Sequence, residues 1–464
     1  MSKTWCPLPW MSQAIRSNGD LRVCCQANTA EGRGILYKES GEAYNGADGN
    51  LTEARNANLM CSIRKDMIAG QWPSACVRCQ REEEAGLVSR RSYEITNWES
   101  QIDFDQAKLG TQEDGKIDAD DFPVRAMDIR FGNKCNLKCR MCSPMDSNSW
   151  YEDHYNLFGA TYQEASGEVR LVPNEKGRFS TTPIRYDWYE SETFWRDLDN
   201  LIPQVKYIQT VGGEPFLIDQ YYDFLERMID KGYAGDTTLE SNSNLTVLPD
   251  RALDLWKHFK RIRIGASIDG VGKVNDYIRH PSKWHLLEKN LHRLDKAEGP
   301  FELWFTSTIQ VANILHFPEL VKWKLESEFQ RFNNRRERPI LTPHVLHRPL
   351  FFNIRILPLE VKSKIAAHLY SLLPWFDSYF SNDAEGKRKA AFYSANYKEM
   401  VDSFISYMNK EDWSHELPKF WAVTQGLDKL RGESFSETFP ELFSMLEPHL
   451  NSKESERYKI VRTL

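Results

Sequence analysis

Three cysteines in one short segment can together hold an iron–sulfur cluster. Cys135, Cys139 and Cys142 follow the spacing C-x3-C-x2-C, so a single loop can direct three thiolates at one centre. Three thiolates complete the coordination of only three irons of a 4Fe–4S cube, and the fourth iron stays open to a ligand that is not protein. The same residues could instead belong to a structural zinc site whose fourth ligand lies elsewhere in the chain.

A second group of cysteines lies near the N-terminus. Cys6, Cys24, Cys76 and Cys79 come from separate segments, and the Asn-Gly pair at 18–19 predicts a hairpin turn between the first two. Four thiolates make a complete tetrahedral set, which suits either a 4Fe–4S cluster or zinc.

Two further cysteines, Cys25 and Cys61, are expected to be small buried residues, although either could replace one of those four ligands. Residues 143–464 contain no cysteine. A disulfide framework would not leave two thirds of a chain without a bridge, so the clustering indicates metal ligation.

Strands that alternate with helical patterns must position the C-x3-C-x2-C loop. Such strands are joined by right-handed parallel crossovers, and ligands gather where the strands end. The loop leaves the first strand at that rim. The predicted strands are 126–131, 205–211, 237–242, 261–268, 301–311 and 350–357.

The cysteine spacing, together with Gly212-Gly213-Glu214-Pro215 directly after a predicted strand, resembles the radical S-adenosylmethionine (SAM) superfamily. In that family the amino and carboxylate groups of SAM bind the open iron, and one electron cleaves SAM to a 5′-deoxyadenosyl radical. The resemblance implies an α/β fold with a partial (β/α)6 TIM-like barrel. It also implies the following contacts with SAM: Met141 at the adenine, Gly212, Gly213 and Glu214 at the methionine amine, Ser243 and Asn244 near the ribose, Ser267 and Asp269 at the ribose or the edge of the site, and Arg279 at the carboxylate.

Several of these positions also have a purely structural explanation. Gly212 to Pro215 could form an ordinary turn, Asp269 could cap a helix, and Arg279 could form a surface ion pair. The sequence does not single out a catalytic acid, base or nucleophile.

The N-terminal cysteine pattern resembles the SPASM/twitch auxiliary-cluster domains of radical SAM enzymes, in the shorter twitch form. Such domains usually follow the radical SAM core, whereas this one precedes it. The resemblance implies a second 4Fe–4S cluster held by Cys6, Cys24, Cys76 and Cys79. The predicted organisation is an auxiliary domain over 1–95, an acidic linker over 96–125, a core over 126–357 with an aromatic-rich insertion at 143–200, and a helical region over 358–464.

Composition limits the possible partners. The net charge of −6 argues against a broad electrostatic grip on nucleic acid. No apolar run reaches the roughly 18–20 residues that span a bilayer, and the N-terminus lacks the apolar stretch of a signal peptide, so we expect a cytoplasmic protein. The resemblance implies an electron donor of the flavodoxin or ferredoxin type, and Arg130, Lys134 and Lys138 place positive charge near the cluster.

These features together predict a radical SAM enzyme with two 4Fe–4S clusters that abstracts hydrogen from a substrate carbon. A small molecule is favoured over a peptide because no separate stretch is typical of a leader-binding domain. The auxiliary cluster would assist oxidation or anchor the substrate. The alternatives are a peptide-modifying radical SAM enzyme and a metal-stabilised binding or regulatory protein that never cleaves SAM.

Overall fold

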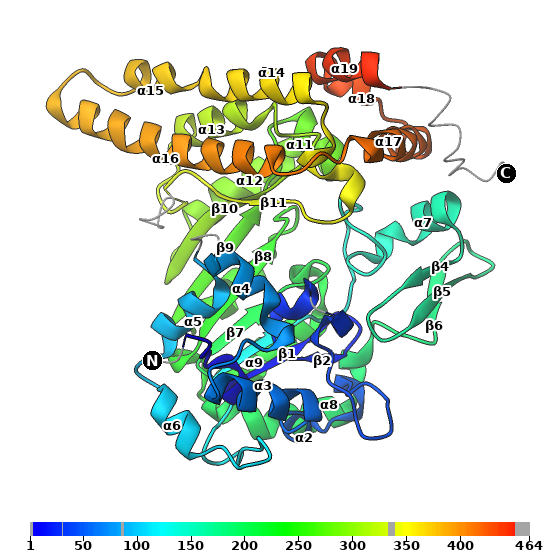
Figure 1. The fold of residues 1–464 in the computed structure, drawn as a ribbon, viewed down its shortest axis with the longest axis vertical. Helices are drawn as coiled ribbons and strands as arrows, with labels where there is room; N and C mark the ends of the chain where they lie inside the picture. Colours follow the sequence, from blue (N-terminus) through cyan, green and yellow to red (C-terminus); the bar gives the residue numbers. More distant parts are fainter. Residues whose placement is uncertain (1–2, 30, 85–87, 333–338, 451–464) are drawn as a thin grey trace.

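A sheet of eight strands forms the centre of the computed structural model, which describes residues 3–29, 31–84, 88–332 and 339–450 (Figure 1). The strand order is β11-β10-β9-β8-β7-β3-β1-β2, and every neighbouring pair is parallel except β1 with β2. The strands are β1 (Ser12–Ile15), β2 (Leu21–Arg22), β3 (Ala126–Ile129), β7 (Tyr207–Thr210), β8 (Thr238–Ser243), β9 (Arg261–Ser267), β10 (Phe301–Ile309) and β11 (Thr342–Val345).

Five of the six predicted strands are confirmed as β3, β7, β8, β9 and β10. The sixth prediction is wrong, because residues 350–357 form two short 3₁₀ turns and the last parallel strand is β11. Asn353 explains the difference: its side chain donates to the Leu346 carbonyl at 2.5 Å and accepts from the Arg355 N–H at 2.9 Å, which bends the chain. Closure of the sheet into a barrel stays a prediction.

The N-terminal hairpin extends this central sheet. Strand β1 pairs in parallel with β3, with Ala14 opposite Asp128, and β2 pairs with β1 as the outermost strand. The N-terminal cysteine region and the predicted core therefore share one sheet. The helices that accompany the hairpin and the acidic segment are α1 (Leu8–Met11), α2 (Leu51–Ala54), α3 (Asn58–Ile68), α4 (Val77–Glu84), α5 (Arg90–Trp98) and α6 (Phe104–Leu109).

Alternation along the strands gives the sheet one apolar face and one polar face. Ile262, Ile264, Leu303 and Phe305 are buried, whereas the residues between them on β9 and β10 include charged side chains. Helices of the parallel crossovers follow the core strands: α9 (Asp219–Asp230), α10 (Asp250–Trp256), α11 (Lys273–Ile278), α12 (Trp284–Asp295) and α13 (Phe317–Glu326).

The insertion at 143–200 forms a small three-stranded antiparallel sheet beside the main one (Figure 1). Its aromatic side chains are anchored on the core, since Trp188 and Trp195 both stack on Phe131 at the end of β3. Its elements are α7 (Tyr151–Phe158), β4 (Thr161–Gln163), β5 (Glu168–Pro173), β6 (Phe179–Thr182) and α8 (Glu192–Leu201).

The C-terminal region is helical as predicted, up to residue 450; residues 451–464 lie outside the described part. Helices α14 to α16 gather with α13 at one end of the molecule, and α2, α3 and α6 lie at the other end (Figure 1). None of the described helices combines the length and the apolarity needed to cross a bilayer. The helices are α14 (Leu359–Tyr370), α15 (Leu373–Tyr379), α16 (Ala384–Asn409), α17 (Leu417–Arg431), α18 (Phe435–Thr438) and α19 (Pro440–Leu446).

Candidate active site

The C-x3-C-x2-C loop leaves the C-terminal end of β3, as the sequence predicts. Its three thiols influence one another electrostatically. The neighbouring thiol of Cys142 lowers the pKa of Cys139, and burial together with Cys139 raises the pKa of Cys135 to about 12. Cys139 is buried and the other two are half-buried. The loop therefore brings three thiols together at the strand rim.

The segment that follows Cys142 holds the cysteine loop in shape. The Cys135 N–H donates to Asn148 Oδ1 at 3.1 Å, and the Trp150 indole N–H donates to the Cys139 carbonyl at 2.8 Å. Ser149 donates its hydroxyl to the Cys135 carbonyl at 2.7 Å. The sequence analysis did not identify these supporting residues. The run Ser-Asn-Ser at 147–149 directly before a helix is the signal that could have revealed them, because such residues favour helix starts.

The Gly-Gly-Glu loop packs its backbone directly on the cysteine loop. Gly213 has a φ of +54°, and a Cβ at this position would lie 2.3 Å from the Lys134 carbonyl oxygen. At Gly212, with φ +90°, a Cβ would lie 2.9 Å from the Cβ of Arg130. The Glu214 N–H then donates to the Lys134 carbonyl at 2.8 Å. Glycine is needed at both positions because only glycine allows these backbone angles and this close approach.

Glu214 connects this loop to the end of β8. Its carboxylate is buried and accepts from the Ser243 hydroxyl at 2.7 Å and from the Asn244 N–H at 2.8 Å. Burial raises the pKa of Glu214 to about 7. The Asn244 side-chain amide lies 3.9 Å from the Cys135 sulfur. The structure therefore brings together three of the predicted SAM-binding residues and one of the cysteines.

Asp269 and Arg279 form a buried ion pair beside the cysteines. Arg279 Nε lies 2.8 Å from Asp269 Oδ2, and Arg279 Nη1 lies 4.0 Å from the Cys139 sulfur. Burial by itself would lower the pKa of Arg279, but Asp269 and the nearby thiols raise it above its ordinary value. Asp269 accepts from the Thr308 N–H at 2.7 Å and caps no helix, since Gly272 is the cap of α11. Both structural alternatives for this pair are therefore wrong.

Two more predicted residues occupy the same rim. Ser267 is the last residue of β9 and is half-buried, and Met141 packs against the core between Cys139 and Cys142. Apart from Arg279, which ends α11, the predicted SAM-binding residues thus come from the ends of neighbouring strands or from the cysteine loop itself, which is where parallel sheets gather their ligands.

The four N-terminal cysteines also come together. Burial raises the pKa of all four thiols, and neighbouring thiols of the group add to this rise for Cys6, Cys24 and Cys76, with the pKa of Cys24 reaching about 12. The thiols of Cys24 and Cys76 both raise the pKa of Cys6, and the thiol of Cys79 raises the pKa of Cys24 and Cys76.

The remaining two cysteines differ from each other. Cys25 lies close to this group, because its thiol raises the pKa of Cys24 and of Cys79. Cys61 is buried on α3 and donates its thiol to the Asn56 carbonyl at 3.3 Å, so its prediction as a buried residue is confirmed. Cys25 is half-buried, so its prediction as a buried residue is wrong, and it stays a candidate to replace one of the four predicted ligands.

The geometry of both cysteine groups bears on the choice between zinc and iron–sulfur. Within the described ranges, no three His, Cys, Asp or Glu side chains are placed to share one metal ion. A tetrahedral zinc ion needs its ligands at about 2.0–2.3 Å from a single point. In a cubane each thiolate binds a different iron, so the sulfurs stand further apart. The choice between zinc and an iron–sulfur cluster therefore stays a prediction at both cysteine groups.

The C-terminal region contributes side chains to the site, and the sequence patterns do not identify these side chains. Arg431, at the end of α17, donates from Nε to Asp153 Oδ2 at 2.8 Å. Lys138, inside the cysteine loop, donates to the other oxygen of Asp153, also at 2.8 Å. This buried carboxylate thus joins the loop, the insertion and the C-terminal helix.

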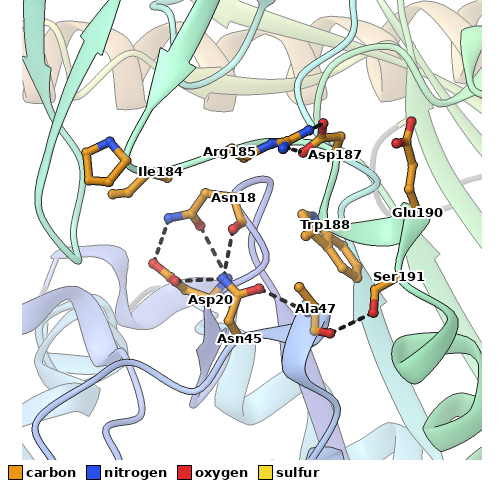
Figure 2. Close-up of a pocket in the computed structure, with 11 residues that line it drawn as sticks. Asn18, Asp20, Asn45, Ala47, Ile184, Arg185, Asp187, Trp188, Glu190 and Ser191 are labelled. Atoms are coloured by element: carbon orange, nitrogen blue, oxygen red, sulfur yellow. Dashed lines mark hydrogen bonds and ion pairs between the residues drawn. The ribbon is translucent and has the colours of Figure 1, made fainter.

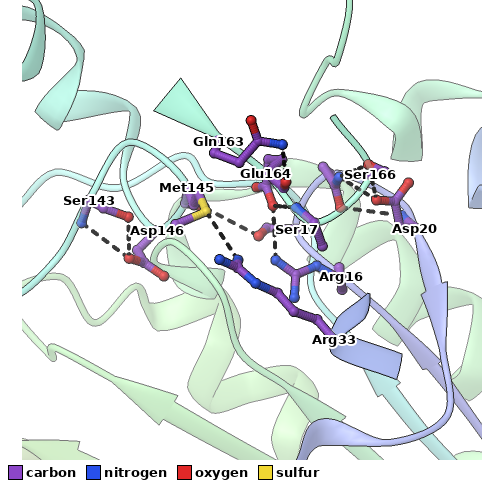
Figure 3. Close-up of polar contacts among 12 residues, drawn as sticks. Arg16, Ser17, Asp20, Arg33, Ser143, Met145, Asp146, Gln163, Glu164 and Ser166 are labelled. Carbon is purple, nitrogen blue, oxygen red and sulfur yellow. Dashed lines mark hydrogen bonds and ion pairs between the residues drawn. The ribbon is translucent and has the colours of Figure 1, made fainter. Parts of the chain in front are cut away.

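The N-terminal hairpin reaches the segment just after Cys142 (Figure 3). Ser17 donates its hydroxyl to the Met145 carbonyl at 3.2 Å, and Arg33 Nη1 lies 3.9 Å from the Met145 sulfur. Arg16 pairs with Glu164 of the insertion at 3.0 Å. One side of the rim is therefore enclosed by the hairpin and the insertion.

A cavity of about 450 Å³ lies between the hairpin turn and residues 183–191 of the insertion (Figure 2). Asp20 forms part of its wall and accepts from the side-chain amides of Asn18 at 2.6 Å and Asn45 at 3.2 Å. Because these polar groups bond to one another, and because no cysteine lines the cavity, we assign it no part in the candidate site.

Comparison with known proteins gives limited likenesses. No curated protein sequence matches the chain. Among solved structures, native anSMEcpe with bound AdoMet shares 14% identity over 55% of this chain and 61% of that one, with a TM-score of 0.34. Streptococcus suis SuiB bound to S-adenosylmethionine shares 10% identity over 68% of this chain and 62% of that one, with a TM-score of 0.31. The chain therefore spans less than two thirds of either protein, and its function has to be argued from its own residues.

The family comparison is more specific. Residues 129–309 match the model of the Radical SAM superfamily. This range runs from the end of β3 to the end of β10 and includes the three cysteines, the Gly-Gly-Glu loop and the Asp269–Arg279 pair. This part of the chain is therefore similar to the Radical SAM superfamily.

Proposed function

We propose that this protein is a radical SAM enzyme that abstracts hydrogen from a carbon of a small-molecule substrate, with an auxiliary cluster that assists the oxidation. The observation that supports it most is the convergence of the cysteine loop, Glu214 and the Asp269–Arg279 pair at one rim of the central sheet. A bound 4Fe–4S cluster supplies the electron that cleaves SAM to a 5′-deoxyadenosyl radical.

The residues at the rim have distinct tasks in this proposal. Cys135, Cys139 and Cys142 hold the cluster. Glu214 offers a carboxylate to the ammonium group of SAM, and Arg279 offers a guanidinium to its carboxylate. These charge-assisted hydrogen bonds orient the methionine part of SAM. The buried surroundings of both charged groups exclude water, which strengthens the interactions.

Ser243, Asn244, Ser267 and Asp269 complete the proposed site on the ribose side, and Met141 provides an apolar contact for the adenine. The hydrogen bond that Ser243 donates to Glu214 fixes the direction of the carboxylate, so Ser243 also supports the contact proposed between Glu214 and the ammonium group of SAM. Gly212 and Gly213 bring the backbone close to the bound methionine.

Cys6, Cys24, Cys76 and Cys79 hold the auxiliary cluster in this proposal. Because four thiolates leave no iron open, such a cluster conducts electrons rather than binding substrate. An external donor of the flavodoxin or ferredoxin type supplies the electron for SAM cleavage, and the reaction takes place in the cytoplasm.

The experiment that tests this function uses the full chain, reconstituted anaerobically with iron and sulfide. With two clusters it should contain about eight irons, and with SAM and dithionite it should form 5′-deoxyadenosine. Bound zinc in place of iron, or an absence of 5′-deoxyadenosine with both clusters in place, would instead favour a metal-stabilised binding protein.

A further inference from the structure

One face of the central sheet, which we call the inner face, carries a row of seven side chains from seven strands, and six of the seven are polar. The inner face of a parallel sheet is usually filled by branched apolar residues. Here the strand register aligns Arg22, Ala14, Asp128, Gln209, Glu240, Arg263 and Glu302. Four of these seven are half-buried rather than buried. A charged and partly accessible inner face is suited to a polar ligand.

In the β8–β10 half of this row, the charged side chains pair with one another. Arg263 lies 2.5 Å from Glu240 and 3.1 Å from Glu302, so its guanidinium has two carboxylate partners at hydrogen-bond distance. Near Glu240, Arg90 and Glu94 of α5 form another ion pair at 2.5 Å. The β8–β10 half of the row therefore offers no cation for a ligand.

In the other half of the row, the carboxylate of Asp128 on β3 is paired more loosely. The carboxylate of Asp128 lies between Arg22 Nη2, at 3.7 Å, and Arg130 Nε, at 3.5 Å. Both separations exceed hydrogen-bond distance. Among the described residues, neither Asp128 oxygen has a hydrogen-bond partner, and nor does the buried Nε of Arg130. A single carboxylate thus faces two guanidinium groups without bonding closely to either.

Arg33 is a second loosely held cation near the same place. In the ranges that the structure covers, no carboxylate oxygen lies within 4.0 Å of its guanidinium, and its polar contact is the Met145 sulfur at 3.9 Å. Met145 precedes Asp146, whose pKa is affected by the charge of Arg130. Arg33 and Arg130 therefore both lie near the segment after Cys142.

Arg130 lies next to the proposed SAM site, and Arg22 lies close in sequence to the N-terminal cysteines. The Cβ of Arg130 packs against Gly212 of the proposed SAM site, and Arg22 precedes Cys24 by two residues. The Arg130 side chain is 27% exposed, so a ligand on the inner face can reach it.

We propose that Arg130 and Arg33 bind an anionic group of the substrate, a carboxylate or a phosphate, between the two cysteine groups. This inference rests on the proposed function, because it names the substrate class of that site. A guanidinium presents a planar fork that matches both anions. The guanidinium group of each arginine is poorly paired within the protein, and a poorly paired charge that is shielded from water is costly. An anion that binds between the two arginines removes this cost.

The test measures the thermal stabilisation of the reconstituted full chain by malonate, phosphate and malonamide at constant ionic strength. Saturating SAM without reductant is present throughout, so that Arg279 and the open iron are occupied. Malonamide has the shape of malonate without its charge. We expect malonate, phosphate or both to stabilise the protein and malonamide to have no effect. Stabilisation by one anion alone identifies the carboxylate or the phosphate as the group recognised.

Variants then assign the effect to the two arginines. Arg130→Gln and Arg33→Gln should each weaken the apparent anion affinity by about tenfold or more, and Arg130→Lys should lose less. Arg261→Gln is the matched control, because this arginine is 59% exposed at the start of β9. Equal stabilisation by malonamide, or an anion affinity that both Gln variants leave unchanged, would overturn the inference.

Formation of 5′-deoxyadenosine is measured on the same preparation of the natural chain. If it forms while anions fail to bind, the anion site is wrong and the proposed function stands. If anions bind through Arg130 and Arg33 but SAM is never cleaved, the proposed function fails instead.

Discussion

The guanidinium of Arg140, inside the C-x3-C-x2-C loop, lies 2.5 Å from the carboxylate of Asp428 in α17. The same group lies 2.7 Å from Glu433 and 3.6 Å from the ring centre of Tyr277. Gly432, in a left-handed conformation with φ +65°, ends α17 and turns the chain so that Glu433 can reach the loop. The C-terminal helices therefore hold the cysteine loop through these contacts with Arg140.

Arg140→Met should destabilise the protein strongly. The Arg140 side chain is 1% exposed, and removing it takes the guanidinium away from two largely buried carboxylates, of which Glu433 keeps His280 and Asp428 keeps the Tyr277 hydroxyl. Loss of one partner of a buried pair costs about 3–5 kcal/mol. Thermal unfolding measures the effect, with the exposed Arg261→Met as the control. A melting temperature that falls equally in both variants would show that the C-terminal contact does not support the loop.

Glu214→Gln should weaken SAM binding while iron content stays the same. The substitution keeps the shape of the side chain and removes one charge from a charge-assisted pair, which contributes roughly 1.5–3 kcal/mol, or about one to two orders of magnitude in affinity. Equilibrium binding of SAM and iron analysis are done on one preparation. Unaltered affinity with a lower melting temperature would mean that Glu214 only shapes the loop.

The pH dependence of SAM binding provides an internal check on this assignment. Burial raises the pKa of Glu214 to about 7, so in the SAM-free protein this group takes up a proton as the pH falls below 7. Only the ionised carboxylate attracts the ammonium group of SAM. The affinity of the natural chain should therefore fall between pH 8 and pH 6, whereas that of Glu214→Gln should change little over the same range.

Gly213→Ala should prevent the Gly-Gly-Glu loop from packing on the cysteine loop. The added methyl group would lie 2.3 Å from the Lys134 carbonyl oxygen, and the φ of +54° is unfavourable for alanine. We expect lower thermal stability together with loss of SAM binding. Gly235→Ala is the control, because a Cβ there meets no atom within 4 Å. Full SAM binding by Gly213→Ala would contradict the close contact described for this loop.

Cys139→Ala should abolish SAM cleavage and leave iron only at the N-terminal cysteines. The three thiolates act as a unit, so losing one removes the cluster that carries an open iron. Assays of 5′-deoxyadenosine and iron follow the two effects separately. Cleavage retained in this variant would refute the assignment of the catalytic cluster.

The paired substitution Cys76→Ala with Cys79→Ala tests the auxiliary cluster. Iron should drop from about eight to about four atoms per chain, because one complete cubane is lost. Uncoupled formation of 5′-deoxyadenosine should persist, since the proposed SAM site keeps its own three cysteines. An unchanged iron content would show that the N-terminal thiols hold no cluster, and a smaller drop would direct attention to Cys25.

The sequence by itself determined the cysteine loop and most of the core strands. Spacing within one loop is a local property, and Gly212 to Glu214 directly follow a strand whose apolar pattern is visible in the chain. The same local reasoning failed at residues 350–357, because an apolar run can be buried equally well as a strand or as a compact turn. There the hydrogen bonds of Asn353 decided the outcome.

Only the tertiary structure showed which distant residues support the site. Arg140 and Asp428 are separated by 288 positions, and the loosely paired Arg130 and Arg33 come from different strands and turns. No periodic pattern in the sequence reveals the partner of a charged residue. The free energy of its charged side chain depends on the groups that surround it after folding. The placement of β1 beside β3 is likewise a matter of tertiary packing, since nothing local in a four-residue strand specifies its neighbour.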